Sequence, residues 1–295
     1  MNNNLLGEGV AYKVTAVNKR KVSYFESGSK DDATILLIHG FGSTALNFLP
    51  LMRELNHYHL IAVDLPARRE SSFSFDEDFY QPKNLAHWLH DFVEHIGLSN
   101  FHIAAHSMGA HYMFEYALCY PVLSCISLDG GYIVPSLFPN YSLEEELNNT
   151  KAYIENLLFE NEDEYYNKMK EQGESEETAL IDRRLLVEKD GKLYFNMPAE
   201  VAVNYVKGAS NYPDYELLEN IKVPVLLLRS DLPAEYNEVR EKSIEQFLKH
   251  LSAELIVVKD SKHSIYTSQK EQTAKYINNW MRKNISSKTF GKEVR

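Results

Sequence analysis

The sequence predicts an α/β protein with a doubly wound, mostly parallel sheet. Two observations lead to this prediction. Short, nearly continuous apolar runs recur along the chain, and such runs are typical of strands buried on both faces of a parallel sheet. Longer helical patterns separate most of these runs. The 295 residues suffice for one large α/β domain, or for a core with an inserted subdomain.

The predicted elements follow in a regular order. Residues 11–26 indicate two short strands joined at Asn18-Lys19-Arg20, an antiparallel hairpin that leads into the core. The expected core strands lie at 34–38, 60–63, 101–105, 125–128, 225–228 and 255–258. The expected helices lie at 45–55, 82–96, 110–120, 237–251 and 269–281.

The alternation of strands and helices stops between about residues 132 and 208. We expect a helical cap there (132–208), inserted between two parts of the core (1–131 and 209–295). Residues 135–208 include 16 acidic and eight basic residues, which we expect to form a solvated face in preference to binding a cationic substrate. Interleaved aromatic residues are expected mainly to pack the cap, and a few to line an apolar pocket. They are Tyr153, Phe159, Tyr165, Tyr166, Tyr194, Phe195, Tyr205 and Tyr212.

The composition is that of an ordinary globular protein, with 44% hydrophobic and 25% charged residues. A formal net charge of −11 argues against binding nucleic acid or an anionic membrane. Two cysteines do not make a disulfide framework. Residues 1–9 lack the layout of a signal peptide, and no apolar run is long enough to span a bilayer. A cytoplasmic location is therefore expected.

The segment Ala105-His106-Ser107-Met108-Gly109 predicts a nucleophile elbow. It lies between an expected strand and an expected helix, with small residues two positions before and after Ser107. A turn this tight leaves no room for larger side chains at those positions. It lifts the serine hydroxyl clear of the backbone, at the positive end of the next helix. Taken alone, the segment fits equally well a strand that runs into a helix with Ser107 as its N-cap.

A second motif, His39-Gly40-Phe41-Gly42, follows the first buried strand. Acyl transfer builds negative charge on a carbonyl oxygen, and a glycine-containing loop can point backbone N–H groups at that charge. The natural pair of donors is the amide of Phe41 and the amide of Met108, the residue after Ser107. An ordinary turn from strand to loop is the alternative interpretation.

His263 has the placement that a catalytic base requires. It follows the last buried strand and precedes the last helix, at the edge of the sheet where the elbow is also expected. Imidazole titrates near neutral pH and can accept the proton of a serine hydroxyl. His102, His106 and His111 cluster near the elbow, but they span strand, turn and helix, so we expect no metal site.

Two aspartates are candidates for the acid that orients this histidine. Asp129 ends the run 125–128 and precedes two glycines, and Asp231 ends the run that begins at residue 225. Either one gives the order serine, aspartate, histidine along the chain. One carboxylate is enough to fix the histidine tautomer and to stabilise the imidazolium. An aspartate at a strand end otherwise often caps the next turn.

In these motifs the chain resembles the α/β-hydrolase superfamily. Four motifs match in order and spacing: the His-Gly-x-Gly loop, Asp64-Leu65-Pro66 at a strand end, the elbow, and the late histidine. The resemblance covers nearly the whole chain, and it implies a core sheet of about eight strands with a cap after the sixth. It also implies Ser107 as the nucleophile, His263 as the base, and Phe41 and Met108 as the oxyanion hole.

Two features depart from the pattern of the relatives. Many relatives continue Asp-Leu-Pro with Gly-x-Gly-x-Ser, whereas this chain has Ala67-Arg68-Arg69-Glu70-Ser71. We expect a structural salt bridge for Arg68 or Arg69 in preference to binding of a substrate carboxylate. The acid usually follows the seventh strand by several residues, so Asp231 comes early. Some relatives place it after the sixth strand, where Asp129 stands.

We therefore expect a serine hydrolase that cleaves a carboxylic ester of a small molecule through an acyl-enzyme. The candidate substrate contacts are His39, Gly40, Gly42, Arg68 and His106. The same triad serves thioesters, lactones, amides, C–C bonds of diketones and acyl transfer. A ligand-sensing protein with the hydrolase fold is a candidate of another class. No cofactor or metal is implied, and the oligomeric state stays open.

Overall fold

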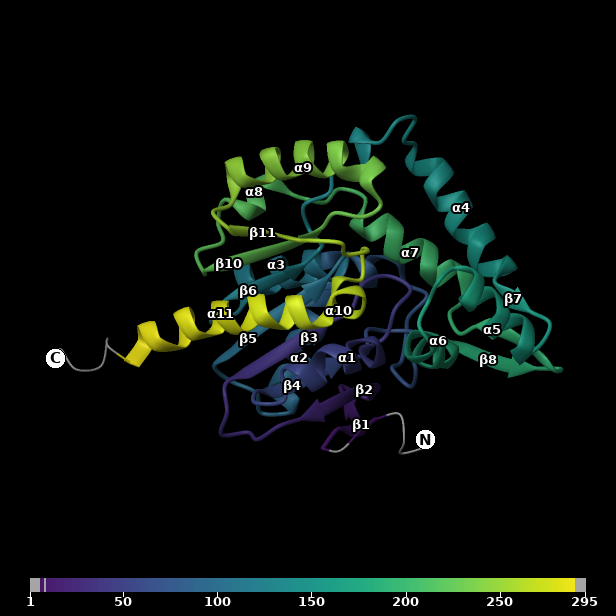
Figure 1. Ribbon diagram of the computed structural model, residues 1–295, viewed down its shortest axis with the longest axis horizontal. Coiled ribbons are helices and arrows are strands. Elements are labelled where there is room, and N and C mark those ends of the chain that lie inside the picture. The colour runs from purple at the N-terminus through teal and green to yellow at the C-terminus, as the bar shows by residue number, and fades with distance from the viewer. Residues whose placement is uncertain (1–5, 8, 290–295) are drawn as a thin grey trace.

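Within residues 6, 7 and 9–289, which the computed structural model describes, eight strands form one sheet in the order β1-β2-β4-β3-β5-β6-β10-β11 (Figure 1). β2 runs antiparallel to β1 and β4, and the other neighbours are parallel. The strands are β1 (Ala11–Val17), β2 (Arg20–Ser27), β3 (Thr34–Ile38), β4 (His59–Val63), β5 (Phe101–His106), β6 (Cys125–Leu128), β10 (Val225–Ser230) and β11 (Glu254–Val258).

The predicted core strands and the predicted hairpin are confirmed, and the bounds of the core strands move by at most two residues. The apolar runs are good predictors here because these strands are covered on both faces. In β3, Leu36 and Ile38 enter the core on one face of the sheet, while Ile35 and Leu37 enter the core on the other face.

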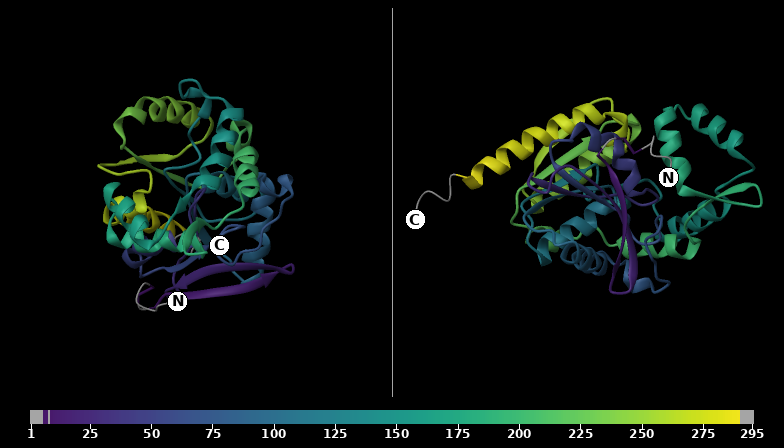
Figure 2. Two further views of the ribbon diagram at one scale, coloured as in Figure 1. Left: turned by 90° about the vertical axis from the view of Figure 1, so that its right-hand side faces the viewer. Right: turned by 90° about the horizontal axis from the view of Figure 1, so that it is seen from below.

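Helices cover both faces of the sheet (Figures 1 and 2). One face is covered by α2 (Pro82–His95), α3 (Gly109–Cys119) and α9 (Asn237–His250), and the other by α1 (Leu49–Glu54) and α11 (Lys270–Thr289). The predicted helix 45–55 is in fact a 3₁₀ turn followed by α1, because Pro50 lacks the N–H of a continuous helix. The shorter helices of the core are η1 (Ala45–Phe48), η2 (Glu77–Tyr80), α8 (Tyr215–Leu218), η5 (Ala234–Tyr236) and α10 (Ile265–Ser268).

Residues 132–209, which lie between β6 and α8, make up the segment expected as a cap, and this segment differs in part from the prediction. Its helices are η3 (Pro135–Leu137), α4 (Leu143–Asn156), α5 (Glu162–Glu171), α6 (Glu176–Asp182), η4 (Arg183–Leu185) and α7 (Ala199–Ala209). The prediction that this segment is purely helical is wrong, because it also contains a small antiparallel sheet. The strands of this sheet are β7 (Leu158–Phe159), β8 (Leu186–Lys189) and β9 (Lys192–Phe195). β8 and β9 meet at Asp190 and Gly191, both with positive φ, which is the Asp-Gly signal of a tight hairpin. These short, half-exposed strands lack the apolar runs that identify the core strands.

The cap is fixed on the core by close contacts of two of its helices (Figure 2). At the end of α6, the Asp182 carboxylate accepts a hydrogen bond of 2.6 Å from the side-chain amide of Asn47 on η1. On α7, Gly208 lies so near η2 that a Cβ atom there would be 2.3 Å from the carbonyl oxygen of Tyr80. Both contacts join cap helices to segments near the carboxyl ends of the core strands.

The beginning of the chain is described only in part. Residues 1–5 and 8 lie outside the described residues. They are most of residues 1–9, in which the sequence shows no signal-peptide pattern. No helix among the described residues is long and apolar enough to cross a membrane. Cys119 and Cys125 are free thiols, the first exposed and the second buried.

The close approach of Gly208 to Tyr80 predicts that replacing this glycine by alanine destabilises the protein, although alanine favours a helix. Alanine normally stabilises a helix interior by about 1 kcal/mol relative to glycine. We expect Gly208→Ala instead to lower the free energy of unfolding by roughly 1–3 kcal/mol, because a backbone carbonyl occupies the space of the new methyl group. Urea unfolding measures the change, with Glu200→Ala on the exposed first turn of α7 as control. A gain in stability for Gly208→Ala would contradict this packing.

Asp182 predicts a pH-dependent stability. Burial raises the pKa of Asp182 to about 6, the hydrogen bond from Asn47 opposes the rise, and the charge of Glu174 adds to it. Since the carboxyl group of the unfolded chain ionises near its ordinary pKa of 3.8, the folded state loses stability as the pH rises through the interval between these two values. Asp182→Asn keeps an oxygen acceptor for Asn47 and removes the charge.

We expect Asp182→Asn to unfold with a free energy roughly 2–3 kcal/mol above wild type at about pH 8, and with an equal free energy at about pH 3. Chemical unfolding at a series of pH values provides the measurement. Glu188→Gln, at an exposed position of β8, is the matched change from acid to amide and is expected to show no such difference. A constant offset between Asp182→Asn and wild type at all pH values would rule out the charge as the cause.

Candidate active site

Ser107 lies at the turn between β5 and α3 with a φ of +53°. This left-handed conformation costs a residue with a side chain roughly 1–2 kcal/mol, and it persists only where the surrounding structure enforces it. The Ser107 amide donates to the carbonyl oxygen of Leu128 on β6 at 3.3 Å. Ala105, where relatives usually carry glycine, lies fully buried in the core, so its methyl group is accommodated.

Glycines make room for this turn. A Cβ atom on Gly130 would lie 2.3 Å from the Ser107 carbonyl oxygen, and one on Gly40 would lie 2.8 Å from the Ser107 Cβ. A Cβ atom on Gly109 would lie 2.6 Å from the carbonyl oxygen of His39. The loops after β3 and β6 can therefore converge on the elbow only because these positions lack side chains.

Ser107, His263 and Asp129 form a continuous chain of hydrogen bonds. The Ser107 hydroxyl donates to Nε2 of His263 at 2.9 Å, and Nδ1–H of His263 donates to Oδ2 of Asp129 at 2.8 Å. The directions follow from the ionised carboxylate, which can only accept hydrogen bonds. In the neutral form of the His263 ring, Nε2 carries no proton and can accept the proton of Ser107, so the arrangement can generate a serine nucleophile.

The Asp129 carboxylate is 3% exposed and accepts further hydrogen bonds. The Tyr132 hydroxyl and the Ser230 amide donate to Oδ1 at 2.7 and 3.0 Å, and the Ser230 hydroxyl donates to Oδ2 at 2.6 Å. Burial alone would raise the pKa of Asp129, but His263 and the two hydroxyl groups hold this pKa at about 2. Asp129 is therefore ionised at neutral pH and can stabilise a positive charge on His263.

Asp231, the other candidate acid, does not contact His263. Its carboxylate accepts a hydrogen bond of 3.1 Å from the Ser261 amide and lies 3.9 Å from the Lys259 ammonium. Asp231 thus ties the end of β10 to the loop that leads to His263. Of the two aspartates, the structure brings Asp129 to the histidine.

The loop after β3 carries Phe41 to the elbow. Gly40 packs on Ser107, and Phe41 lines the same cavity as Ser107 and His263. Among the described residues, the amides of Phe41 and Met108 donate to no backbone carbonyl in a turn, loop or cap. They can therefore donate to an oxygen atom of a group bound at Ser107.

The buried ring of His39 holds this loop through hydrogen bonds to two backbone groups. Its Nε2 accepts a hydrogen bond of 3.0 Å from the Leu65 amide, so its proton lies on Nδ1 and is donated to the Gly40 carbonyl oxygen at 2.8 Å. Burial lowers the pKa of His39 to about 3, so the ring is neutral. The expectation that His39 contacts substrate is therefore corrected, since both ring nitrogens bind backbone groups and the ring is 1% exposed.

Arg68 holds the same loop from the side of the cap. Its guanidinium donates to the carbonyl oxygens of Ser43 and Gly42 at 2.8 and 3.0 Å, and to that of Asn196 in the cap at 3.3 Å. It also lies 4.5 Å from the centre of the Phe195 ring. Burial lowers the pKa of Arg68 to about 10, so the group stays protonated at neutral pH. Arg68 does not form the salt bridge expected of Arg68 or Arg69. Its expected contact with substrate is corrected, because the buried guanidinium is occupied by backbone carbonyl oxygens.

The structural salt bridge belongs to Arg69, whose Nε lies 3.4 Å from the buried carboxylate of Asp64. Ala67 and Arg69 have φ angles of +62° and +49°. These are the two positions at which relatives carry the glycines of Gly-x-Gly. Both residues thus adopt the left-handed conformation that glycine accommodates without strain, and the contacts of Arg68 and Arg69 hold this segment in place.

His106 supports the loop of the catalytic-base candidate. Its Nε2 donates to the carbonyl oxygen of His263 at 3.1 Å, and the two rings lie 4.6 Å apart. Burial, followed by the nearby His263, lowers the pKa of His106 to about 3. The neutral ring of His106 and Gly42 both line the cavity beside Ser107, whereas Gly40 does not.

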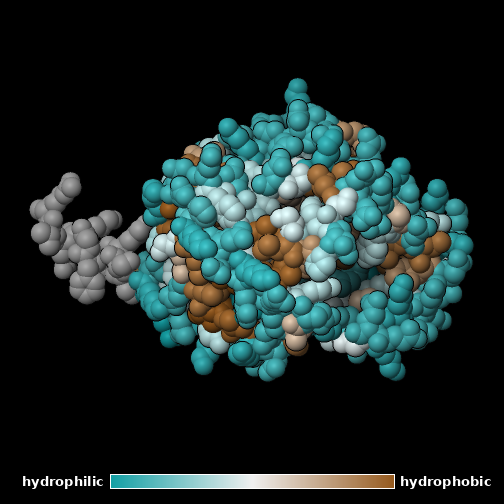
Figure 3. All heavy atoms as spheres, turned by 90° about the horizontal axis from the view of Figure 1, so that it is seen from above, coloured by the Kyte–Doolittle hydropathy of each residue, from teal (hydrophilic) through white to brown (hydrophobic). Residues whose placement is uncertain are grey.

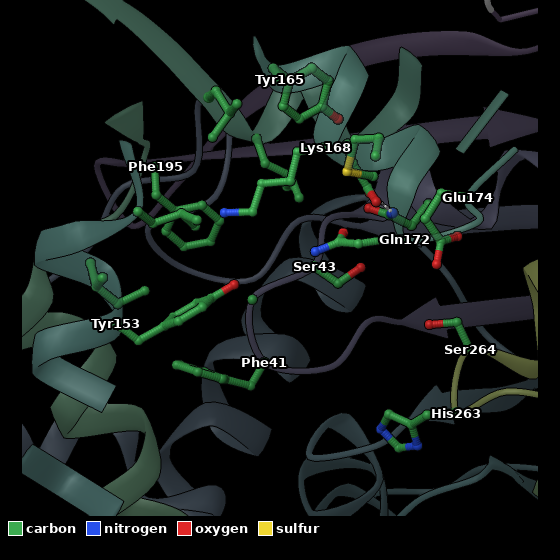
Figure 4. Close-up of a pocket in the computed structure, with 18 of the residues that line it drawn as sticks. Phe41, Ser43, Tyr153, Tyr165, Lys168, Gln172, Glu174, Phe195, His263 and Ser264 are labelled. Carbon is green, nitrogen blue, oxygen red and sulfur yellow. Dashed lines mark hydrogen bonds between the residues drawn. The ribbon is translucent and has the colours of Figure 1, made fainter. Parts of the chain in front are cut away.

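A cavity of about 530 Å³ extends from Ser107 and His263 to the cap (Figure 4). Its apolar wall includes four of the aromatic residues that the sequence places in the cap, together with Ile154 and Leu157. Those aromatic residues are Tyr153, Phe159, Tyr165 and Phe195. The cavity also has polar and charged wall residues, namely Asn47, Lys168, Gln172, Glu174 and Asp182.

A second cavity of about 280 Å³ borders the same two residues, Ser107 and His263, and continues past Met108 and His111 to Tyr212. Beside it, a groove of about 590 Å³ runs along α4. Figure 3 shows the surface hollowed toward the cap end of the molecule, with apolar residues beside the hollow. The Ser107 hydroxyl thus lies between two spaces that can receive the two sides of a bond.

Sequence reasoning missed the charged groups of the first cavity. Lys168 and Met169 follow the buried Tyr165 by three and four positions on α5, so they share its face of the helix. This spacing is the signal that could have identified Lys168. Among the described residues, no group of three or more His, Cys, Asp and Glu side chains could hold a metal ion.

Part of the chain resembles curated lipases. Lipase 1 of Psychrobacter immobilis is 38% identical over 109 residues, which are 37% of this chain and 34% of that lipase. Lipase 3 of a Moraxella species is 36% identical over 109 residues, with the same coverage of each chain. The matched part therefore spans about a third of the length of these relatives.

Solved structures are similar over almost the whole chain. E-2-(acetamidomethylene)succinate hydrolase has a TM-score of 0.72 at 20% identity and covers 92% of this chain and 99% of its own. A putative lipase from Acinetobacter baumannii has a TM-score of 0.68 at 23% identity and covers 96% and 94%. At these identities the likeness concerns the fold alone. Residues 33–268 match the family model described as the alpha/beta hydrolase fold, and the chain belongs to this family.

Proposed function

We propose that the protein is a serine hydrolase that cleaves a carboxylic ester of a small molecule through an acyl-enzyme. The observation that carries this proposal is the hydrogen-bonded chain of Ser107, His263 and Asp129 beside the amides of Phe41 and Met108. The family and the partial similarity to two lipases support hydrolysis of an ester.

In the first half of the reaction, the Ser107 oxygen attacks the ester carbonyl carbon while Nε2 of His263 accepts the hydroxyl proton. The carbonyl oxygen becomes an oxyanion, which accepts hydrogen bonds from the Phe41 and Met108 amides. Asp129 stabilises the imidazolium. His263 then donates the proton to the departing alkoxide, so that an alcohol leaves and the acyl group stays on Ser107.

In the second half, His263 accepts a proton from a water molecule, and the resulting hydroxide attacks the acyl carbon. The same two amides bind the oxyanion. The proton returns from His263 to the Ser107 oxygen, and a carboxylic acid leaves. The two cavities on either side of Ser107 would hold the acyl and alcohol parts of the ester.

Esterase assays with Ser107→Ala test this proposal. We expect wild type to hydrolyse p-nitrophenyl esters with repeated turnover, and the variant to lose activity by a factor of roughly 10⁴–10⁶, because the nucleophile is gone. Mass spectrometry of wild type quenched during turnover should show the acyl group on Ser107. Equal activity, or equal inactivity, of wild type and variant on esters, thioesters and lactones would refute the proposal.

The contacts of the two aspartates predict opposite outcomes for a matched pair of variants. Asp129→Asn should lower kcat by roughly 10⁴, because an amide partner favours the wrong tautomer of His263. Asp231→Asn should lower kcat by less than about tenfold, since Asp231 binds only the loop that leads to the histidine. Unfolding midpoints of both variants control for stability. A larger loss for Asp231→Asn would assign the acid to Asp231.

A further inference from the structure

Lys168, an exposed residue on the wall of the first cavity, has an ammonium group without an ion-pair partner among the described residues. Lys168 on α5 lines the cavity, and its Nζ lies 5.3 Å from the centre of the Phe159 ring. In Figure 4 this side chain points into the cavity, toward Phe195 and Tyr153. Among the described residues, no carboxylate lies within 4.0 Å of the Lys168 ammonium.

The acidic groups of the cavity have other partners. The Glu174 carboxylate is 2.9 Å from the Lys262 ammonium, and Asp182 accepts its 2.6 Å hydrogen bond from Asn47. Lys168 is therefore the cavity cation whose charge the described protein does not compensate by an ion pair. A cap rich in acidic residues repels anions at long range, so an anionic ligand would need such a local cation.

A second donor lies beside this ammonium. Tyr153 on α4 lines the same cavity, and in Figure 4 its hydroxyl points inward, on the side where the Lys168 ammonium lies. Tyr153 is 62% exposed, and no hydrogen bond joins its hydroxyl to another described residue. An ammonium and a hydroxyl from two helices can together donate to the two oxygens of one carboxylate. A hydrocarbon chain in this place would displace water from the Lys168 ammonium group without offering it a hydrogen-bond acceptor, which is unfavourable.

We propose that the substrate of this site is an ester that bears a carboxylate at its far end, and that Lys168 and Tyr153 bind this carboxylate. The inference rests on the proposed ester hydrolysis. Phe159, Phe195 and Leu157 contact the methylene groups between the ester and the carboxylate, and Ser107 attacks the ester carbonyl. Lys168 thus selects the substrate and takes no part in proton transfer.

Two substrate series test the selection. One consists of mono-p-nitrophenyl esters of dicarboxylic acids from succinate to sebacate, and the other has a neutral carboxamide in place of each free carboxylate. For the best chain length, we expect wild type to favour the carboxylate by about tenfold in kcat/KM, mainly through KM, as for one charged hydrogen-bonded contact. In Lys168→Met this preference should disappear, and in Lys168→Arg it should persist.

Matched controls separate this contact from general effects on the cap. Lys170→Met changes the same residue type at an exposed position of the same helix, and should keep the preference of wild type. Tyr153→Phe should reduce the preference in part. An equal preference for both series in wild type, or an equal loss of preference in Lys168→Met and Lys170→Met, would overturn the inference.

Binding measurements separate the two proposals. Calorimetry on Ser107→Ala compares two ligands, the mono-anilide of the best dicarboxylic acid and the same anilide with a carboxamide in place of the free carboxylate. We expect the carboxylate ligand to bind more tightly. This difference should disappear in the double variant Ser107→Ala, Lys168→Met. If wild type hydrolyses neutral esters through Ser107 without binding the carboxylate better, the substrate inference alone fails. If it binds the carboxylate through Lys168 but hydrolyses no ester, the proposed reaction fails and the anion site stands.

Discussion

The close packing of three backbone segments on Ser107 is the constraint on which the rest of the site depends. The elbow needs a left-handed residue with a side chain, which is unfavourable in isolation. It is held there because Gly40 and Gly130 let the neighbouring loops approach to distances that no side chain allows. The same loops carry Phe41 and Asp129. One packing requirement therefore positions the candidate nucleophile, one candidate oxyanion donor and the candidate acid.

A buried cation maintains the loop on the other side of the elbow. Arg68 is 2% exposed, and a charge in such a place is costly unless polar groups replace its water. Carbonyl oxygens of Gly42, Ser43 and Asn196 do so, and the Phe195 ring covers the guanidinium. Because two of these carbonyls belong to the loop after β3 and one belongs to the cap, Arg68 connects that loop to the cap.

The cap gives the site its character as a binding pocket. Aromatic side chains of α4, α5 and β9 form an apolar wall, while Lys168 and Asp182 carry charge into the same space. Asp182 also connects α6 to the core through Asn47, so a residue that lines the cavity contributes to the docking of the cap as well. The wall of the cavity and the position of the cap are thus linked through α5 and α6, which follow one another directly along the chain.

The sequence by itself determined the core strands, the turn at Ser107 and the candidate residues Ser107 and His263, because buried strands and tight turns restrict residue types locally. It did not separate Asp129 from Asp231, since both end parallel strands, and only the path of the loop before His263 brings one of them to the imidazole. It also missed the strands of the cap, whose exposed faces lack an apolar pattern. The partners of Arg68 were decided by tertiary structure alone, because the charge of a long side chain acts at a distance from its backbone position, where other segments of the chain supply its partners.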